Sequence, residues 1–276
     1  MRSLSVAVPL LIAAAVTAYA RAEAEPKAFE PTFYLPRSHS HNDYAQARPL
    51  FEALERGFAS IEVDVFLVDG ALLVGHEPEK VRPDVTLGQL YLDPLRDIAR
   101  RNGGSVYAGS DQSLQLLIDV KSEADATYRA LHETLRGYAD LFTTWTADGS
   151  EQGAVTAVLS GNRATALIGA RTPRYVAIDG RVQENRSKLG VDLVPLVSVD
   201  WKELGPLEER PERARALVVQ LHAEGRKVRF WATPEREDLW QSLIAMDVDY
   251  VGTDQVDRLD PVLRAASSPS SLTVDR

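Results

Sequence analysis

Two acidic residues one position apart, Glu62 and Asp64, lie within the apolar run IEVDV. Strand side chains alternate between the two faces of a sheet, so both carboxylates would project from the same face. A pair of this kind can bind one hard cation through its oxygens. His41 precedes the pair and His76 follows it, and imidazoles at these positions could move protons around whatever the cation holds.

The fragment LLIDVK repeats this spacing with Asp119 and Lys121. An acid and a lysine would again share one strand face. Charged groups and imidazoles placed at the ends of apolar runs are poorly explained as aids to solubility. The combination predicts a metal-dependent active site.

Eight apolar runs are expected to form the strands that position these residues, namely 37–41, 60–66, 114–120, 154–159, 175–178, 193–199, 227–231 and 250–254. A short run at 71–74 follows an Asp69-Gly70 turn. Helices are expected over 49–56, over 86–101 with an interruption near Asp93-Pro94, from Ser122 onward, over 211–224, and from a cap at Thr233-Pro234.

The alternation of strands and helices predicts a parallel sheet, and eight such units predict closure into a single-domain (β/α)8 TIM barrel. The barrel is expected to span 37–262, after a linker over 21–36 and before a disordered tail over 263–276. Catalytic groups of such barrels lie at the carboxyl ends of the strands. The residues expected there are His41, Glu62, Asp64, Asp119, Lys121, Trp231 and Asp254.

The composition narrows the function classes. A net charge of −9 gives no electrostatic footprint for nucleic acid or for an anionic membrane surface. The chain has 0 cysteines, which excludes disulfides, thiolate metal ligands and a cysteine nucleophile. A small phosphorylated substrate, drawn in by local positive charge, agrees with both facts.

The N-terminus is expected to be a signal peptide over 1–20, with basic Arg2, an apolar run over 4–17 and a small-x-small site at Ala18-Tyr19-Ala20. The run is shorter than the roughly 20 residues of a permanent span, so no stable membrane span is expected after its removal. An uncleaved anchor is the alternative. The expected destination is outside the cytoplasm, either periplasmic or secreted.

Taken in order, the site fragments resemble the glycerophosphodiester phosphodiesterase-like superfamily, which also contains phosphatidylinositol-specific phospholipases C and sphingomyelinase D-type enzymes. These fragments are HND at 41–43, EVD at 62–64, GH at 75–76, DVK at 119–121, FWAT at 230–233 and GTD at 252–254. The blocks SHSHNDY at 38–44 and FWATPE at 230–235 resemble most closely the branch named after yeast "altered inheritance of mitochondria" proteins.

This resemblance implies a distorted (β/α)8 barrel that binds one divalent cation through Glu62, Asp64 and Asp119. It also implies His41 and His76 as the acid–base pair and Lys121 as a contact to a phosphate oxygen. We further expect Trp231 and Asn42 to contact the substrate.

The sequence departs from the superfamily pattern at two positions. Asp119 stands where many glycerophosphodiesterases have glutamate, which is closer to the sphingomyelinase D pattern. His41 is followed by Asn42-Asp43 where the typical phosphodiesterase has Arg-Gly. Both changes lie near the expected phosphate, so they bear on the identity of the substrate.

The same chemistry follows from the residues themselves. A three-carboxylate site favours Mg²⁺ or Ca²⁺, which would neutralise phosphoryl oxygens. One histidine would remove a proton from the nucleophile and the other would protonate the leaving oxygen. The hypothesis is an exported phosphodiesterase of lipid metabolism that cleaves a glycerophosphodiester or a phospholipid-type diester. Attack by a neighbouring substrate hydroxyl would give a cyclic phosphate, and attack by water is the alternative.

Two other functions compete with this one. A non-catalytic barrel that binds a phosphate or a lipid headgroup would need no acid–base pair. An amidohydrolase-type hydrolase would use His39 and His41 as metal ligands with Asp254 as a late aspartate, although zinc prefers more nitrogen ligands than this chain offers. Single residues also have structural interpretations: Trp231 could pack within the barrel, and Asp254 could cap the segment that follows it.

Overall fold

The computed structural model describes residues 29–184 and 186–267. In this part of the chain, eight parallel strands follow one another around a closed barrel in the order β1, β2, β4, β7, β8, β9, β10 and β11. Pairing of β1 with both β2 and β11 closes the barrel, as the sequence predicts. The barrel strands are β1 (Leu35–Ser40), β2 (Phe58–Val68), β4 (Leu114–Val120), β7 (Val155–Gly161), β8 (Val176–Gly180), β9 (Leu196–Asp200), β10 (Lys227–Trp231) and β11 (Tyr250–Thr253).

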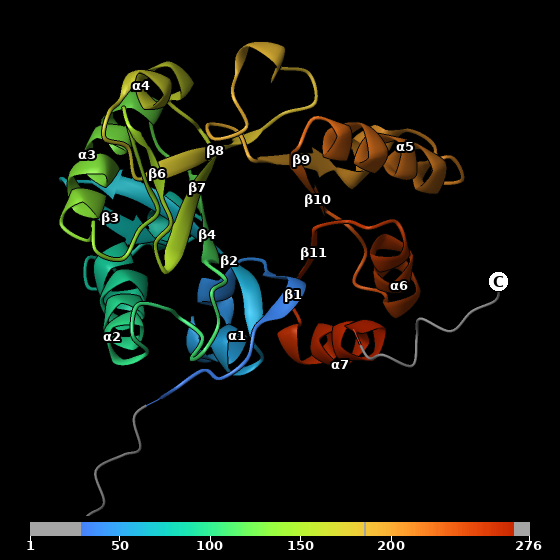
Figure 1. The fold of residues 1–276 in the computed structure, drawn as a ribbon, viewed down its shortest axis with the longest axis horizontal. Coiled ribbons are helices and arrows are strands. Elements are labelled where there is room, and N and C mark those ends of the chain that lie inside the picture. The colour runs from blue at the N-terminus through green and yellow to red at the C-terminus, as the bar shows by residue number, and fades with distance from the viewer. Residues whose placement is uncertain (1–28, 185, 268–276) are drawn as a thin grey trace, which may run out of the picture.

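The helices lie outside the strands, with α2, α3 and α4 on one side and α5, α6 and α7 on the other (Figure 1). They are α1 (Phe51–Glu55), α2 (Asp93–Arg101), α3 (Ala124–Arg136), α4 (Thr165–Ala170), α5 (Arg210–Ala223), α6 (Glu237–Ala245) and α7 (Val256–Ser267). Short 3-10 turns are η1 (Asp43–Ala45), η2 (Pro78–Lys80), η4 (Arg186–Lys188) and η5 (Trp201–Leu204), and η3 (Gly88–Leu92) is a π-helical turn that runs directly into α2. None of the helices in the described ranges is both long enough and apolar enough to cross a membrane.

Strand β3 (Ala71–Val74) lies outside the parallel order. It pairs antiparallel with β2 after the Asp69-Gly70 turn, with Val65 opposite Val74. The described chain also contains a short hairpin that the sequence analysis did not predict, formed by β5 (Thr144–Thr146) and β6 (Gly149–Glu151). Because β3 ends at Val74, the hairpin with β2 carries the next residues, Gly75 and His76, back toward the end of the barrel.

Both faces of the barrel strands are buried, as expected for parallel strands covered by helices. Ile61, Val63 and Val65 on β2 are fully buried against the outer layer, while the alternate residues face the barrel interior. The polar residues of this interior are therefore removed from bulk water. A buried polar group is costly without a partner, so the partners of these residues reveal how the site is built.

Several predicted boundaries are wrong. The helix expected from Ser122 is instead capped by Glu123, whose carboxylate accepts hydrogen bonds from Asp125 N and Ala126 N, while Ser122 Oγ accepts one from Leu67 N. The helix expected at Thr233-Pro234 begins only at Glu237, after a loop.

At the C-terminal end, α7 continues to Ser267, so the last five described residues of the expected tail are helical. The remaining tail, over 268–276, lies outside the described residues, as does the predicted signal peptide over 1–20. Of the linker expected over 21–36, only its final part is described, and β1 already begins within it at Leu35.

Candidate active site

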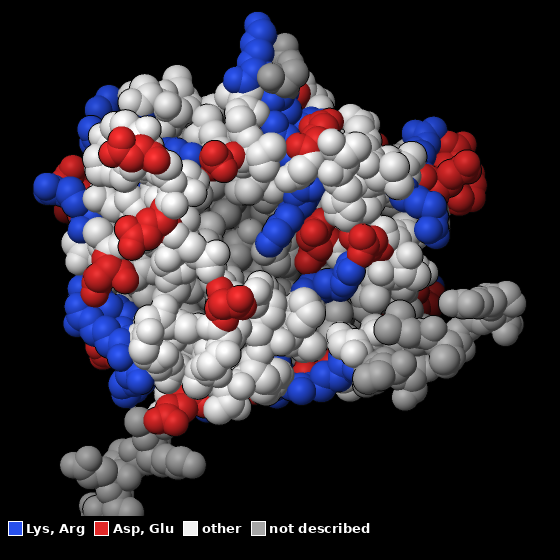
Figure 2. Space-filling view, in the orientation of Figure 1, with Lys and Arg blue, Asp and Glu red and all other residues white. Residues whose placement is uncertain are grey.

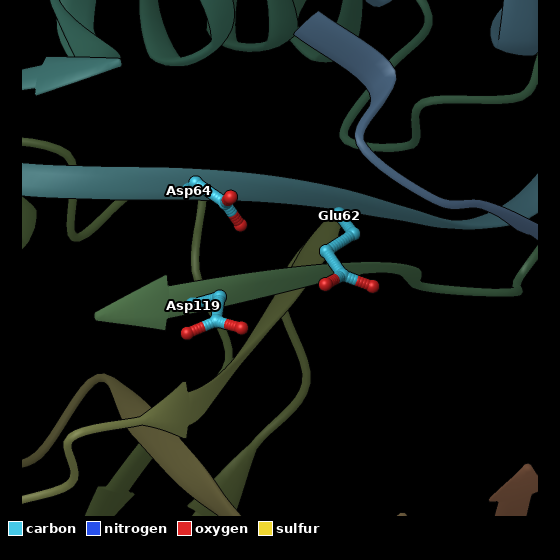
Figure 3. Close-up of side chains that lie close together, drawn as sticks. All are labelled: Glu62, Asp64 and Asp119. Atoms are coloured by element: carbon cyan, nitrogen blue, oxygen red, sulfur yellow. The ribbon is translucent and has the colours of Figure 1, made fainter. Parts of the chain in front are cut away.

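Three carboxylates converge at the carboxyl ends of β2 and β4. Glu62 and Asp64 project from the interior face of β2, and Asp119 lies directly opposite Asp64 in the parallel register of β2 and β4. One oxygen from each residue lies within 4.8 Å of the others. Figure 3 shows the three side chains on the same side of the two strands. The alternation that the sequence predicts is therefore present, and it brings all three acids together.

The residues of this cluster fit a hard divalent cation. Asp64 is fully buried, and its Oδ1 atom has no hydrogen-bond partner among the described residues. Three carboxylates so close together repel one another unless a positive charge offsets them. Carboxylate oxygens are the ligands that Mg²⁺ and Ca²⁺ prefer. Glu62, Asp64 and Asp119 would hold such an ion.

A glycine makes room for Asp119. Gly161, at the end of β7, has a φ of +66°, and a Cβ atom added to it would lie 2.0 Å from Asp119 Oδ1. Such a distance is a severe overlap, and the left-handed backbone conformation also disfavours other residues. Gly161 therefore allows the carboxylate of Asp119 to occupy its place in the cluster.

Glu62 is fixed by a buried polar network. Arg229 on β10 donates to Glu62 Oε2, and His39 Nε2 lies 2.9 Å from the same oxygen. Burial works to raise the pKa of Glu62, but the Arg229 guanidinium and the His39 hydrogen bond together hold it well below its ordinary value. Glu62 is thus held in its ionised form.

His39 is a neutral structural residue. It is fully buried, and burial together with the nearby Arg229 charge lowers its pKa to about 4. Gln115 Nε2 donates to Ser60 Oγ over 2.8 Å, and Ser60 Oγ lies 2.8 Å from His39 Nδ1. With the Ser60 hydroxyl donating to Nδ1, Nε2–H is free to donate to Glu62. Both ring nitrogens of His39 are engaged, so the amidohydrolase-type use of His39 and His41 as metal ligands finds no support here.

His41 follows β1 at the mouth of the barrel and pairs with Asp254. The distance from His41 Nδ1 to Asp254 Oδ1 is 2.7 Å. Burial lowers the pKa of His41, but the hydrogen bond to Asp254 and the charge of Glu62 outweigh it, so the net pKa is raised. The carboxylate of Asp254 is directed to His41, whereas the hydroxyl of Thr253 accepts the hydrogen bond from Gln255 N. The Asp254 carboxylate therefore contacts His41, and it is Thr253 that accepts the hydrogen bond at the start of the following segment.

Asp254 is itself held by a residue that the sequence analysis did not identify. Glu235, in the loop after β10, accepts a 2.6 Å hydrogen bond from the Thr253 hydroxyl and a 2.9 Å hydrogen bond from Asp254 N. The end of β11 is thereby tied to the FWATPE block. Glu235 lies 19 residues from Asp254 in the sequence, and neither position marks this contact.

His76 approaches the acid cluster from the β2–β3 hairpin. Its Nδ1 atom lies 2.9 Å from Asp64 Oδ2, and Gly75 N donates to Asp64 O over 3.2 Å. Tyr44, which the sequence analysis also missed, places its hydroxyl 2.7 Å from Asp64 Oδ2 and 2.8 Å from Asn42 Oδ1. The Asn42 amide lies 3.3 Å from His41 Nδ1, so Asn42 and Tyr44 bridge the surroundings of the two histidines.

Lys121 lies between two of the acids. Its Nζ atom is 3.0 Å from Asp119 Oδ2 and 3.3 Å from Asp64 Oδ2. Burial lowers the pKa of Lys121, but these two carboxylates outweigh it and leave the pKa raised. For Asp119, burial raises the pKa more than Lys121 lowers it. Lys121 is therefore a charged neighbour of the cluster.

Most of the predicted residues line a common cavity of about 430 Å³, namely Asn42, Lys121 and Trp231 together with Glu62, Asp119 and both histidines, whereas Asp64 is buried beside it. Trp231 is 41% exposed there, so it does not simply pack within the barrel. The same cavity also contains Arg181 and Arg229, which the sequence analysis did not single out. In the view of Figure 2, the surface is hollowed near its middle, and acidic and basic side chains border the hollow.

The remaining histidines, His132 and His222, do not line this cavity. His132 lies on α3 and packs against Tyr128 and Tyr175. His222 lies near the end of α5, where its Nε2 atom is 2.8 Å from Asp249 Oδ2.

Comparison with known proteins identifies the family of this chain. A family model described as "AIM6-like phosphodiesterase domain" matches residues 34–179. "Altered inheritance of mitochondria protein 6" of Eremothecium gossypii is 29% identical over 272 residues, covering 81% of this chain and 68% of that protein. A homologue of this protein from Arthroderma benhamiae is 27% identical over 254 residues, covering 79% of this chain and 81% of that protein.

Among solved structures, a glycerophosphodiester phosphodiesterase from Parabacteroides distasonis superposes with a TM-score of 0.56 at 16% identity. The match covers 86% of this chain and 100% of that chain. At this identity the likeness concerns the fold, and it agrees with the predicted barrel. The resemblance inferred from the sequence fragments, including the narrower branch, is confirmed by the family model and the relatives.

The relatives also correct the predicted localisation. Their names refer to altered inheritance of mitochondria, and they give no support to export. The prediction of a periplasmic or secreted protein is therefore wrong. It rested on a basic residue followed by a short apolar run, a compositional signal that is not specific to one compartment.

Proposed function

The chain belongs to the AIM6-like phosphodiesterase domain family, and from this premise we propose that it is a metal-dependent phosphodiesterase acting on a glycerophosphodiester or phospholipid-type diester. The observation that carries the proposal is the group of Glu62, Asp64 and Asp119 at a cavity that His41 and His76 also line. Within the described chain, the buried Oδ1 atom of Asp64 has no hydrogen-bond partner. A barrel that only bound a phosphate would not need such a set.

The cation would be Mg²⁺ or Ca²⁺, held by Glu62, Asp64 and Asp119. When bound, it supplies positive charge that offsets the phosphoryl oxygens and favours ionisation of an attacking hydroxyl. Arg229 and His39 keep Glu62 ionised and fix its orientation. The protein thus presents a rigid acidic pocket before the substrate arrives.

His41 is the proposed general base. Its Nδ1–H donates to Asp254, so the lone pair of Nε2 is available to the cavity that His41 lines. Nε2 takes the proton from the attacking oxygen, which belongs to a neighbouring substrate hydroxyl or to water, while Asp254 stabilises the imidazolium that forms. The raised pKa of His41 strengthens it as a base.

His76 is the proposed general acid. Its Nδ1 atom is oriented by Asp64, which leaves Nε2–H to protonate the leaving alkoxide as the phosphorus–oxygen bond breaks. The side chain is 64% exposed, so it can regain a proton from solvent after each turnover. The two histidines act on opposite ends of the reacting phosphodiester.

Three further residues are proposed to contact the substrate. Lys121 supplies a fixed positive charge beside a phosphoryl oxygen. Trp231, exposed at the cavity wall, offers an apolar face to an alcohol group. Asn42 offers an amide next to His41. These side chains surround the place where the three acids and both histidines meet.

Hydrolysis of a chromogenic phosphodiester tests the proposal. Activity should disappear with a chelator and return with Mg²⁺ or Ca²⁺, and His41→Ala or His76→Ala should each lower turnover by about a hundredfold or more with the fold intact. Phosphorus NMR over a panel of diesters would identify the substrate and any cyclic phosphate. Binding without turnover across the panel would favour the headgroup-binding barrel instead.

A further inference from the structure

Three cationic side chains line the active-site cavity within the described chain: Lys121, Arg181 and Arg229. Two of them, Arg229 and Lys121, already have close polar partners in the protein. Arg229 donates to Glu62 Oε2 and to Ser198 Oγ in the barrel interior. Lys121 lies between two acids of the cluster, at 3.0 and 3.3 Å. Neither cation is free to recognise a further anion at a distance from the cluster.

Arg181 differs from both. In the described part of the chain, its guanidinium makes a single polar contact, at 3.5 Å, with Asp179 Oδ2. That carboxylate already accepts a 2.9 Å hydrogen bond from Ser160 Oγ and a 2.8 Å hydrogen bond to its other oxygen from Ser198 N. Arg181 carries five donors in a planar fork, so most of them have no partner among the described residues, and the residue lines the cavity.

The backbone of Arg181 is nevertheless held in place. Arg181 N donates to Glu184 Oε2 over 2.9 Å, and Arg181 O accepts from Arg186 Nη1 over 2.9 Å. Glu184 is in turn bound by Arg163 at 2.8 Å. A fixed backbone with an under-paired side chain is the arrangement expected of a preorganised ligand contact.

Arg181 lies away from the acid cluster. It directly follows β8, and β7 separates β8 from β4, which carries Asp119. Neighbouring strands are spaced by about 4.8 Å, so β8 lies roughly 10 Å from β4 around the barrel. A group at Arg181 would therefore be a different part of the ligand from the phosphate at the cluster.

Between these two positions the cavity wall offers little to an anion. The Ser160 hydroxyl is engaged by Asp179, and the Asn162 amide donates to Ser122 O over 3.0 Å. A neutral or cationic ligand group beside Arg181 would leave its guanidinium without an anionic partner. An oxyanion would instead receive two parallel hydrogen bonds from it.

We propose that Arg181 binds a second oxyanion on the substrate, a phosphomonoester or a carboxylate carried by one of the two alcohols of the diester. This inference rests on the proposed function in that it places the scissile phosphate at the acid cluster. It narrows the substrate class to diesters that bear an additional negative charge about 10 Å or less from the scissile phosphorus.

Paired ligands test the inference: glycerophosphoglycerol, and the same molecule with a terminal phosphomonoester. Calorimetry with the full chain carrying His41→Ala measures binding independently of turnover. The terminal phosphate is expected to tighten binding about tenfold or more. Arg181→Gln should abolish this gain, and Lys188→Gln should preserve it, because Lys188 is exposed on the same loop and does not line the cavity.

Three results would overturn the inference: no gain from the terminal phosphate, a gain that survives Arg181→Gln, or an equal loss for both ligands. The last result would place Arg181 at the shared diester. Turnover by the unmodified protein separates the two proposals. An Arg181-dependent gain without diester cleavage would remove the proposed function alone, whereas cleavage without such a gain would remove this inference alone.

Discussion

Asp254 Oδ1 lies 2.7 Å from His41 Nδ1, although 213 residues separate the two in the sequence. The pair joins the end of the first barrel strand to the end of the last one. This contact fixes the orientation of the ring and raises its pKa against the opposing effect of burial.

Replacing Asp254 with asparagine tests the role of His41 as a base. Without the carboxylate the pKa of His41 falls, so the base is deprotonated from a lower pH onward. The acid limb of the profile of kcat/KM against pH should therefore move to lower pH, and the maximum rate should drop by about tenfold to a hundredfold. Asp257→Asn, at an exposed position on α7, serves as the control and should leave the profile in place. A shift of the limb to higher pH would contradict the assignment.

Glu235 is expected to act through Asp254, because its carboxylate holds Asp254 N and the Thr253 hydroxyl. Glu235→Ala should lower kcat/KM and move the acid limb in the same direction as Asp254→Asn. Combining the two substitutions should cost little more than Asp254→Asn alone, because residues in one network are not additive. Fully additive effects with an unchanged pH profile would reduce Glu235 to a merely structural residue.

Cation binding should be visible without any substrate. The three clustered acids repel one another, so adding Mg²⁺ or Ca²⁺ should raise the melting temperature, with a free-energy gain of about 2.7 kcal/mol at a hundredfold excess over Kd. Asp64→Asn or Asp119→Asn should abolish the rise. Asp84→Asn, on the exposed loop before η3, should retain it. A rise of equal size in all three variants would place the cation elsewhere.

Gly161→Ala, on the neighbouring strand β7, should displace the Asp119 carboxylate from the acid cluster. The added methyl group would meet Asp119 Oδ1 at 2.0 Å and Val120 O at 2.5 Å. Gly103→Ala is a matched control, because Gly103 has a similar φ of +72° with no atom within 4 Å of the added carbon. Both variants should lose about 1 kcal/mol of stability or more from backbone strain. Only Gly161→Ala should also weaken cation binding, as calorimetry with the metal alone would measure.

The barrel and the acid cluster could be predicted from the sequence because they depend on local patterns. Apolar runs mark the strands, and the alternation within IEVDV and LLIDVK puts the acids on one face. Parallel strands then bring their carboxyl ends to one end of the barrel. These three regularities are sufficient to place Glu62, Asp64 and Asp119 together.

The supporting contacts depend on pairs that no local pattern marks. Arg229 lies 167 residues from Glu62 in the sequence, yet it determines the ionisation of that carboxylate. Tyr44 and Glu235 lie within the blocks SHSHNDY and FWATPE, but neither block indicates which partner these side chains contact. The start of α6 was misplaced because Thr233-Pro234 has the composition of a helix cap, while the chain first turns to bring Glu235 to β11.

His76 follows the antiparallel hairpin of β2 and β3, so it is attached to the barrel differently from the other site residues. The acids and His41 belong to the closed ring of strands, whereas His76 is delivered by a side branch anchored through Gly75 N and Asp64 O. Altering the length of that hairpin would change the reach of His76, the proposed proton donor, while sparing the barrel. Leaving groups of different size could therefore be accommodated by remodelling one hairpin, a modular route to diversification within a shared scaffold.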